Sequence, residues 1–226
     1  MGVGAGLAVV RFGLEVQRLK RQVPAHREYW DQRNADGEFG YVSLGDSSAQ
    51  GVGVDDPADG YVSILAERLA TQQNRPVAVR NLSVSGATLA TLIDDQLPQL
   101  AELPTPAVCT LCIGGNDMIQ RRFDPNRFRD EFAQILAALP PGAFVGDLPT
   151  FGHWPFEPRV RAVNPIIHEL VADHGHHLVP LHEVSRAQWL VRILGQVNGD
   201  WFHPNQAGYR LWADAFWDAM ESNRPA

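Results

Sequence analysis

Four short motifs combine residue types that are suited to nucleophilic chemistry. In chain order they are Gly45-Asp46-Ser47, Ser85-Gly86-Ala87, Gly114-Gly115-Asn116-Asp117 and Asp200-Trp201-Phe202-His203. A serine hydroxyl is a weak nucleophile until a base removes its proton, and a histidine base works better when a carboxylate orients it. Backbone N–H groups and an asparagine amide can stabilise an oxyanion. Each motif alone is weak, because these residue types fill loops in every protein, but together they contain the parts of a serine esterase.

The fourth motif and Gly86 each have a simpler interpretation. Asp200 and His203 are three residues apart, about one helical turn, so the carboxylate can lie beside the imidazole of its near neighbour. Alternatively, they cap a helix that Pro204 starts, since aspartate is common at helix N-caps. Gly86, taken alone, is more simply an ordinary turn glycine. The elements that carry the motifs are needed to choose between these interpretations.

Apolar periodicity predicts that strands alternate with helices from residue 39 onward. We expect strands at 39–44, 77–82, 107–113, 143–148 and 177–181. Helices are expected from Tyr61, at 89–97 closed by Pro98 and Pro104, at 128–139 stopped by Pro140-Pro141-Gly142, at 160–171 with Pro165 inside, and from Pro204. This alternation predicts an α/β protein with three α/β/α layers and a five-stranded parallel sheet.

The first three motifs each follow directly after an expected strand. In a parallel sheet covered by helices, ligands bind beyond the carboxyl ends of the strands. Ser47, Gly86 and Asn116 are therefore expected along one edge of the sheet, where chance would have scattered them.

The four motifs, in this order, resemble the sequence blocks of the SGNH (GDSL-type) hydrolase family, and the resemblance extends over residues 39 to about 220. It implies a flavodoxin-like fold. It also implies that Ser47 is the nucleophile, His203 the general base and then acid, and Asp200 its orienting partner. The implied oxyanion donors are the N–H groups of Ser47 and Gly86 and the amide of Asn116.

One residue departs from the pattern of the family, since Ser48 stands where many relatives have leucine. The chain also has no G-x-S-x-G elbow, which separates it from the α/β-hydrolase arrangement. Asp46 is expected to brace its turn, and Asp117 is expected to be structural.

The implied activity is hydrolysis of carboxylic esters through an acyl-serine intermediate, with a small-molecule ester as substrate and no metal or organic cofactor. A carbohydrate O-deacetylase or an acyltransferase is the alternative on the same site. A catalytically silent ligand-binding domain is the alternative of another class, against which the intact set of five site residues argues. Two apolar segments, 151–156 and 189–194, form either an acyl-binding wall or lid, or ordinary core packing.

Composition restricts the remaining possibilities. The 226-residue chain carries a formal charge of −7, which argues against a nucleic-acid partner. Its two cysteines, Cys109 and Cys112, fall on an expected strand, where residues three apart point to opposite faces, so we expect inert core thiols. The histidines near residue 175 are expected in a solvated turn rather than at a metal; they are His174, His176 and His177.

The chain is divided into a basic N-terminal segment, 1–38, and a hydrolase domain, 39–226. Gly6 to Val10 is apolar, but Arg11 and Glu15 interrupt it before the roughly 20 apolar residues that a spanning helix needs. Three interpretations stay open: a helix packed on the domain, the remnant of a signal or membrane anchor, or a helix lying on a membrane surface. The default location is the cytoplasm, with membrane association or export if the true start lies upstream.

Overall fold

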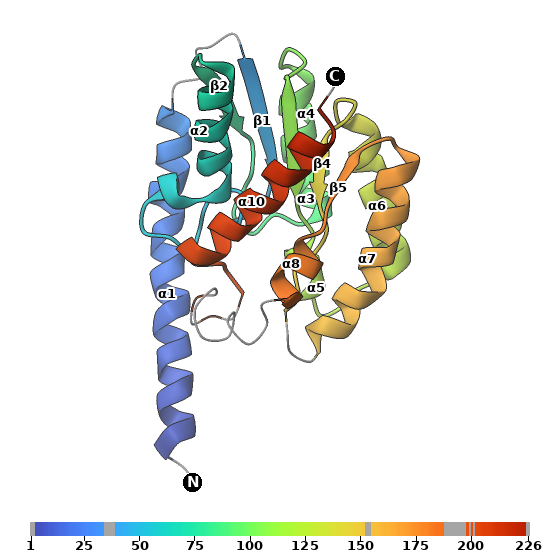
Figure 1. Cartoon of the computed structure of the whole chain (residues 1–226). Coiled ribbons are helices and arrows are strands. Elements are labelled where there is room, and N and C mark those ends of the chain that lie inside the picture. The colour runs from blue at the N-terminus through green and yellow to red at the C-terminus, as the bar shows by residue number, and fades with distance from the viewer. Residues whose placement is uncertain are drawn as a thin grey trace.

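The protein is built around a five-stranded parallel sheet. The computed structural model describes residues 3–33, 39–151, 155–187, 198, 200 and 202–224, with side chains from residue 13 (Figure 1). The strand order is β2-β1-β3-β4-β5, and every pairing is parallel. The strands are β1 (Phe39–Gly45), β2 (Val77–Asn81), β3 (Val108–Cys112), β4 (Phe144–Gly146) and β5 (His177–Val179). The predicted five-stranded sheet is therefore confirmed.

Helices α2 (Tyr61–Gln73) and α10 (Gln206–Ser222) cover one face of the sheet, together with the end of α1. Their apolar side chains pack on Tyr41, Val79 and Cys112 from the strands. Tyr61 of α2 stacks on Phe216 of α10 with ring centroids 5.2 Å apart, which joins the two helices through aromatic contact. Figure 1 shows α10 crossing this face diagonally.

The opposite face carries the helices between β2 and β5. They are α3 (Leu89–Thr91), the π-helical segment η2 (Leu92–Gln96), α4 (Leu97–Ala101), α6 (Pro125–Ala138) and α7 (Phe156–Asp173). Phe128 and Phe132 of α6 are fully buried against the strands. Short elements complete the domain: η1 (Pro57–Asp59), α5 (Gly115–Met118) and α8 (Leu181–Ala187). The three-layer α/β/α architecture is confirmed.

The two cysteines lie on opposite faces of β3, as their spacing predicts. Cys109 packs with the α6 and α7 side, and Cys112 packs with the α2 and α10 side. Both thiols are free and buried, and burial raises the pKa of Cys109 to about 12. These thiols are core side chains and not a redox pair.

Two predicted helix boundaries are wrong. The helix that begins at Leu89 does not stop at Pro98. The Leu97 N–H bonds back to the Leu92 carbonyl in a wider turn, and Pro98 then occupies the first turn of α4, where its missing N–H costs nothing. The second boundary is the start of the last helix. Asn205, and not Pro204, is the N-cap of α10, because its side chain accepts the Gly208 N–H.

The expected solvated turn at the histidine cluster is wrong for His176, which is 9% exposed. Its Nδ1 accepts the Ala143 N–H at 3.2 Å, and its Nε2 donates to the Leu136 carbonyl at 2.9 Å. Burial lowers the pKa of His176, in keeping with a neutral ring that joins the end of α6 to the start of β4. The sequence does not indicate this role, since the two partners, Ala143 and Leu136, lie 33 and 40 positions away.

The N-terminal segment forms one long helix, α1 (Val3–Gln32), that runs beside α2 and projects beyond the domain at its N-terminal end (Figure 1). Leu19, His26 and Trp30 are buried, so the second half of α1 packs on the domain. Tyr29 shares a hydrogen bond of 3.2 Å with Ser63 of α2. Among the described residues, no helix has the length and apolar character needed to cross a membrane. The domain boundary at residue 38 stays a prediction. So do the alternatives of a signal or anchor remnant and of a helix lying on a membrane surface, and the cytoplasmic location.

Candidate active site

Ser47 lies in the turn that follows β1. Gly45 ends the strand with φ +150°, and a Cβ built there would stand 2.2 Å from the Cys112 carbonyl oxygen, so only glycine lets β1 lie this close to β3. In the next position, the Asp46 carboxylate accepts the Ser48 N–H at 2.9 Å. These constraints hold Ser47, which is 5% exposed, at the carboxyl edge of the sheet.

A chain of two hydrogen bonds joins Ser47, His203 and Asp200. The Ser47 Oγ lies 2.9 Å from the Nε2 of His203, across 156 positions of sequence. The Nδ1 of the same ring lies 2.6 Å from Asp200 Oδ2. Asp200 Oδ1 also accepts the N–H groups of Phe202 and His203, each at 3.1 Å. The alternative in which Asp200 caps the last helix is wrong, because Asn205 does so.

The partners of His203 define its tautomer. Nδ1 faces a carboxylate and therefore carries the proton, which leaves Nε2 to accept the Ser47 hydroxyl proton. Burial alone would raise the pKa of Asp200, but the hydrogen bonds from the His203 ring and from two backbone N–H groups lower it below its usual value. Asp200 is thus held ionised beside the imidazole, which is the state that stabilises a developing imidazolium.

Two backbone N–H groups near Ser47 are uncommitted. Within the described residues, neither the Ser47 N–H nor the Gly86 N–H donates a hydrogen bond. Gly86 has φ +84°, and a Cβ built there would meet no atom within 4 Å, so the space above it is open. An uncommitted donor after β1 and another beside open space after β2 are suited to an incoming oxyanion.

Asn116 follows β3 and connects the other loops. Its Nδ2 donates to the Ala87 carbonyl at 2.9 Å, and Asp46 Oδ2 lies 3.5 Å from the same nitrogen. The second contact is long for a hydrogen bond, so it holds the amide less firmly than the first. The neighbouring Asp117 accepts the Leu89 N–H at 3.2 Å, and burial raises its pKa to about 7. The structure thus gathers all five predicted site residues at one edge of the sheet.

Three polar residues that the motifs do not include hold these loops in place. Gln96 is fully buried in η2. Its Oε1 accepts the Gly45 N–H at 3.0 Å, and its Nε2 donates to the Gly45 carbonyl at 2.7 Å. Gln50 donates to the Ser83 carbonyl at 2.8 Å and accepts the Ser85 hydroxyl. Asn198 bonds to the backbone on both sides of the His203–Pro204 peptide. No local pattern marks them, because each also bonds to a group far away in the sequence, which for Asn198 is the Gly53 carbonyl.

The remaining sequence expectations fall partly outside the described residues. Residues 152–154 of the apolar segment 151–156 and the whole segment 189–194 lie outside them. In the described part of the chain, no three His, Cys, Asp or Glu side chains are grouped in a way that could hold a metal ion.

A sequence profile covers the region that contains this site. The profile of the GDSL-like Lipase/Acylhydrolase family matches residues 43–211, three quarters of the chain. The chain belongs to this family. The predicted family and ester-hydrolase activity are therefore confirmed, and the alternative of a catalytically silent ligand-binding domain is dropped.

Solved structures of several hydrolases share the fold of this GDSL-like hydrolase. An α/β hydrolase, LAE5, from the metagenome of Lake Arreo, Spain, matches with a TM-score of 0.69 at 20% identity, covering 83% of this chain and 97% of that one. A lipolytic G-D-S-L family protein from Veillonella parvula matches with 0.65 at 20%, covering 81% and 98%. Axe2, an acetylxylan esterase from Geobacillus stearothermophilus, matches with 0.65 at 14%, covering 83% and 96%. No curated protein sequence matches significantly.

Proposed function

We propose that this GDSL-like hydrolase cleaves carboxylic esters through an acyl-serine intermediate on Ser47. The observation that carries the proposal is the continuous hydrogen-bonded chain from Ser47 Oγ through His203 to Asp200, with separations of 2.9 and 2.6 Å. A buried serine is nucleophilic only with such a base at hydrogen-bond distance. Family membership supports the reaction class, and the geometry supports the assignment of roles.

In the proposed reaction, the Ser47 oxygen attacks the ester carbonyl carbon while His203 Nε2 takes the hydroxyl proton. The carbonyl oxygen becomes an oxyanion, which the N–H groups of Ser47 and Gly86 and the Asn116 amide stabilise. Collapse of the intermediate breaks the carbon–oxygen bond to the alcohol, which leaves with the proton from His203. Water, deprotonated by the same imidazole, then attacks the acyl-serine and releases the acid.

An apolar wall beside the imidazole favours an ester with a hydrocarbon acyl group. The rings of Phe151 and Phe202 lie 5.2 Å apart, and Phe202 meets the His203 ring edge-on at 5.0 Å. Both aromatic rings lie within 4 Å of a Cβ built on Gly115, next to Asn116. Phe151 is buried in the core, whereas Phe202 is only partly buried, so its exposed part is suited to the acyl chain rather than to a charged group.

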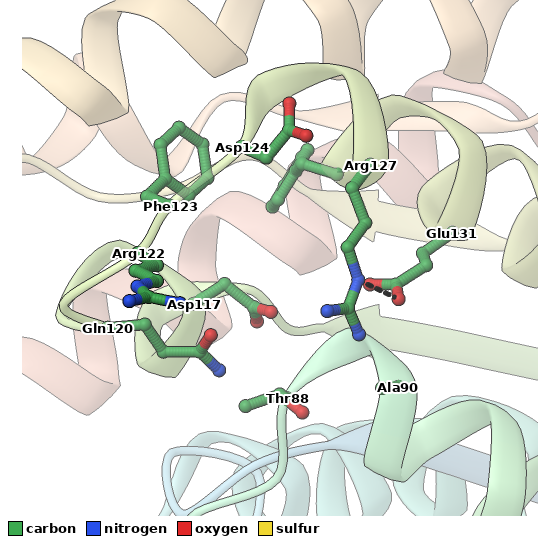
Figure 2. Close-up of a pocket in the computed structure, with 10 residues that line it drawn as sticks. Thr88, Ala90, Asp117, Gln120, Arg122, Phe123, Asp124, Arg127 and Glu131 are labelled. Atoms are coloured by element: carbon green, nitrogen blue, oxygen red, sulfur yellow. Dashed lines mark hydrogen bonds and ion pairs between the residues drawn. The ribbon is translucent and has the colours of Figure 1, made fainter.

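A second candidate, a carbohydrate O-deacetylase, rests on a polar pocket near the same loops (Figure 2). Its wall includes Thr88, two residues after Gly86, and Asp117, directly after Asn116. Figure 2 shows the Asp117 carboxylate and the Arg127 guanidinium both facing this hollow, and Arg127 pairs with Glu131 at 2.7 Å. Walls with donors and acceptors of both charges are suited to hydroxyl groups, such as those of a sugar that leaves as the alcohol.

The deciding experiment is the Ser47→Ala substitution, assayed on p-nitrophenyl esters and with a fluorophosphonate probe. Turnover is expected to fall by at least about 10⁴-fold and labelling to disappear, because the nucleophile is gone. Ser48→Ala is the matched control, since it alters the adjacent side chain and keeps the N–H that Asp46 accepts. Persistent labelling of Ser47→Ala would show that another residue is the nucleophile.

The two substrate classes are separated by comparing acyl chains with acetylated sugars on the unaltered enzyme. Under the first proposal, kcat/KM rises from p-nitrophenyl acetate to longer acyl chains, since each buried methylene group adds up to about 0.8 kcal/mol of binding free energy. Under the second, acetylated sugars are cleaved with higher kcat/KM than any p-nitrophenyl ester of the series.

A further inference from the structure

Helix α1 contacts the loops that carry the catalytic groups, although it lies outside residues 43–211 that the family profile matches. One line of contact runs through Arg18, near the middle of the helix. Its Nη1 donates to Asp55 at 2.8 Å, and its Nη2 donates to the Asn198 side chain at 3.0 Å. Glu15, one turn earlier on the helix, accepts from the same guanidinium at 2.7 and 3.0 Å. The guanidinium therefore joins α1 to two loops at once.

Gln22, one turn further along α1, holds the first of these loops. Its Nε2 donates to the carboxylate of Asp55 at 3.0 Å, and its Oε1 accepts the Gly53 N–H at 3.2 Å. Gly53 lies in the loop that follows Ser47. A Cβ built on Gly53 would stand 2.2 Å from the Pro204 carbonyl oxygen and 3.3 Å from the His203 Cβ. This loop is therefore packed directly against the backbone of the catalytic histidine.

Asn198 completes the connection to His203. Its backbone N–H donates to the His203 carbonyl at 2.9 Å. Its side-chain nitrogen donates to the carbonyls of Gly53 and Pro204, each at 2.9 Å. One asparagine thus ties the loop after Ser47 to the segment of His203, and Arg18 holds the oxygen of the same side chain.

A second line of contact runs from the end of α1 to the loop that contains Gly86. The buried Trp30 donates its Nε1–H to the Gln50 carbonyl at 3.1 Å. The Gln50 side chain in turn bonds to Ser83 and Ser85. Helix α1 is therefore connected both to His203 and to the oxyanion loop, which is the segment 83–86 that carries Gly86.

We propose that α1 is a brace for the active site, in which Arg18 and Gln22 are positioning residues that act through Asn198 and Gly53 on the backbone of His203. The inference rests on the proposed function of Ser47 and His203. Neither Arg18 nor Gln22 contacts the reacting atoms. Their effect is to fix the imidazole at 2.9 Å from the serine oxygen, and small misplacements of a catalytic group slow the chemical step.

The test compares Arg18→Met with Arg27→Met in the full chain. Arg27 lies on the same helix, its side chain is 76% exposed, and its one ion pair among the described residues is with Asp31, at 3.9 Å, so it serves as the matched control. Arg18→Met is expected to lower kcat about 10-fold while KM changes less than about twofold, because orientation of the base and not substrate contact is lost. The rate of fluorophosphonate labelling falls by the same factor, and Arg18→Lys restores part of both.

A double-mutant cycle separates the brace from a general loss of structure. If Arg18 acts through Asn198, then Arg18→Met slows the Asn198→Ala variant by less than about twofold. Additive losses, an unchanged kcat in Arg18→Met, or an equal loss in Arg27→Met would each overturn the inference. Ser47→Ala is measured in parallel. If it keeps its activity, the proposed function itself fails and this inference fails with it, whereas an inactive Ser47→Ala beside a fully active Arg18→Met refutes the brace alone.

Discussion

Two carboxylate–histidine pairs lie at the carboxyl edge of the sheet, and they differ in what surrounds them. Asp200 contacts His203 at 2.6 Å, and Asp147, directly after β4, contacts His168 at 2.8 Å. The far nitrogen of His203 meets the Ser47 hydroxyl. The far nitrogen of His168 meets no partner in the described part of the chain, and its side chain is 46% exposed. Contact between a carboxylate and an imidazole therefore does not by itself make a catalytic base.

The electrostatic states of the two carboxylates differ as well. Burial raises the pKa of Asp147 despite the hydrogen bonds from His168 and from the His182 N–H. The pKa of Asp200 is lowered, since the His203 ring and two backbone N–H groups outweigh the effect of burial. The hydrogen bonds that Asp200 accepts therefore favour its charged form beside the imidazole, whereas burial disfavours the charged form of Asp147. The comparison indicates that number and type of donors, not proximity alone, distinguish the catalytic pair.

Substitution of each carboxylate by its amide tests this comparison most directly. Asp200→Asn is expected to lower kcat by about 10⁴-fold, because an amide neither holds the Nδ1 proton in place nor stabilises the imidazolium. Asp147→Asn is expected to leave kcat within about twofold, since His168 does not face the serine. Steady-state kinetics on one p-nitrophenyl ester measures both. Equal losses in the two variants would contradict the distinction between the pairs.

The second prediction compares alanine substitutions at two glycines, one in the proposed oxyanion loop and one outside the site. Gly86→Ala forces a residue with a Cβ to hold φ near +84°, which costs about 1–2 kcal/mol of stability or moves the N–H donor. We expect kcat to fall about 10²-fold, the loss measured when one oxyanion donor is removed. Gly175→Ala is the control, because Gly175 has φ +71° and equally open surroundings far from Ser47.

The readout for this pair is kcat together with the free energy of unfolding in urea. Both alanine variants are expected to lose similar stability, whereas only Gly86→Ala loses activity. If Gly86→Ala is as active as Gly175→Ala, the N–H of residue 86 is not an oxyanion donor.

The smallest expected effect is a pH dependence of stability that has opposite sign at the two carboxylates. The lowered pKa of Asp200 means that its stabilising contribution is present above its unfolded pKa of about 3.9 and is lost as pH falls through the folded value. The raised pKa of Asp147 means that its ionisation lowers stability as pH rises from about 3.9 through the folded value.

Urea unfolding of the two amide variants between pH 3 and pH 7 measures this difference. Relative to the unaltered chain, Asp200→Asn becomes less stable as pH rises, whereas Asp147→Asn becomes relatively more stable. Parallel pH profiles for the two variants would show that the two carboxylates have similar environments.

Local sequence was sufficient for the order of elements and for the motif residues. Short apolar runs and period-3.6 apolar patterns predicted the five strands and most helices, and motifs placed after strands predicted that Ser47, Gly86 and Asn116 share an edge. The spacing of Asp200 and His203 predicted their contact, since three residues suffice to bring the side chains together. Boundaries at Pro98 and Pro204 were wrong, because a wider turn and an asparagine cap replace the simpler geometry.

Only the tertiary structure decided which polar residues support the site. Arg18, Gln50, Gln96 and Asn198 each bond to a group that lies 33 or more positions away, so no periodicity or spacing marks them. The same holds for His176, whose ring is buried by α6 and β4 rather than solvated. The sequence by itself determined the chemistry of the catalytic groups, because that chemistry resides in the residue types of short motifs, three after strands and one before the last helix. Their support depends on contacts that exist only once α1 and the loops have packed together.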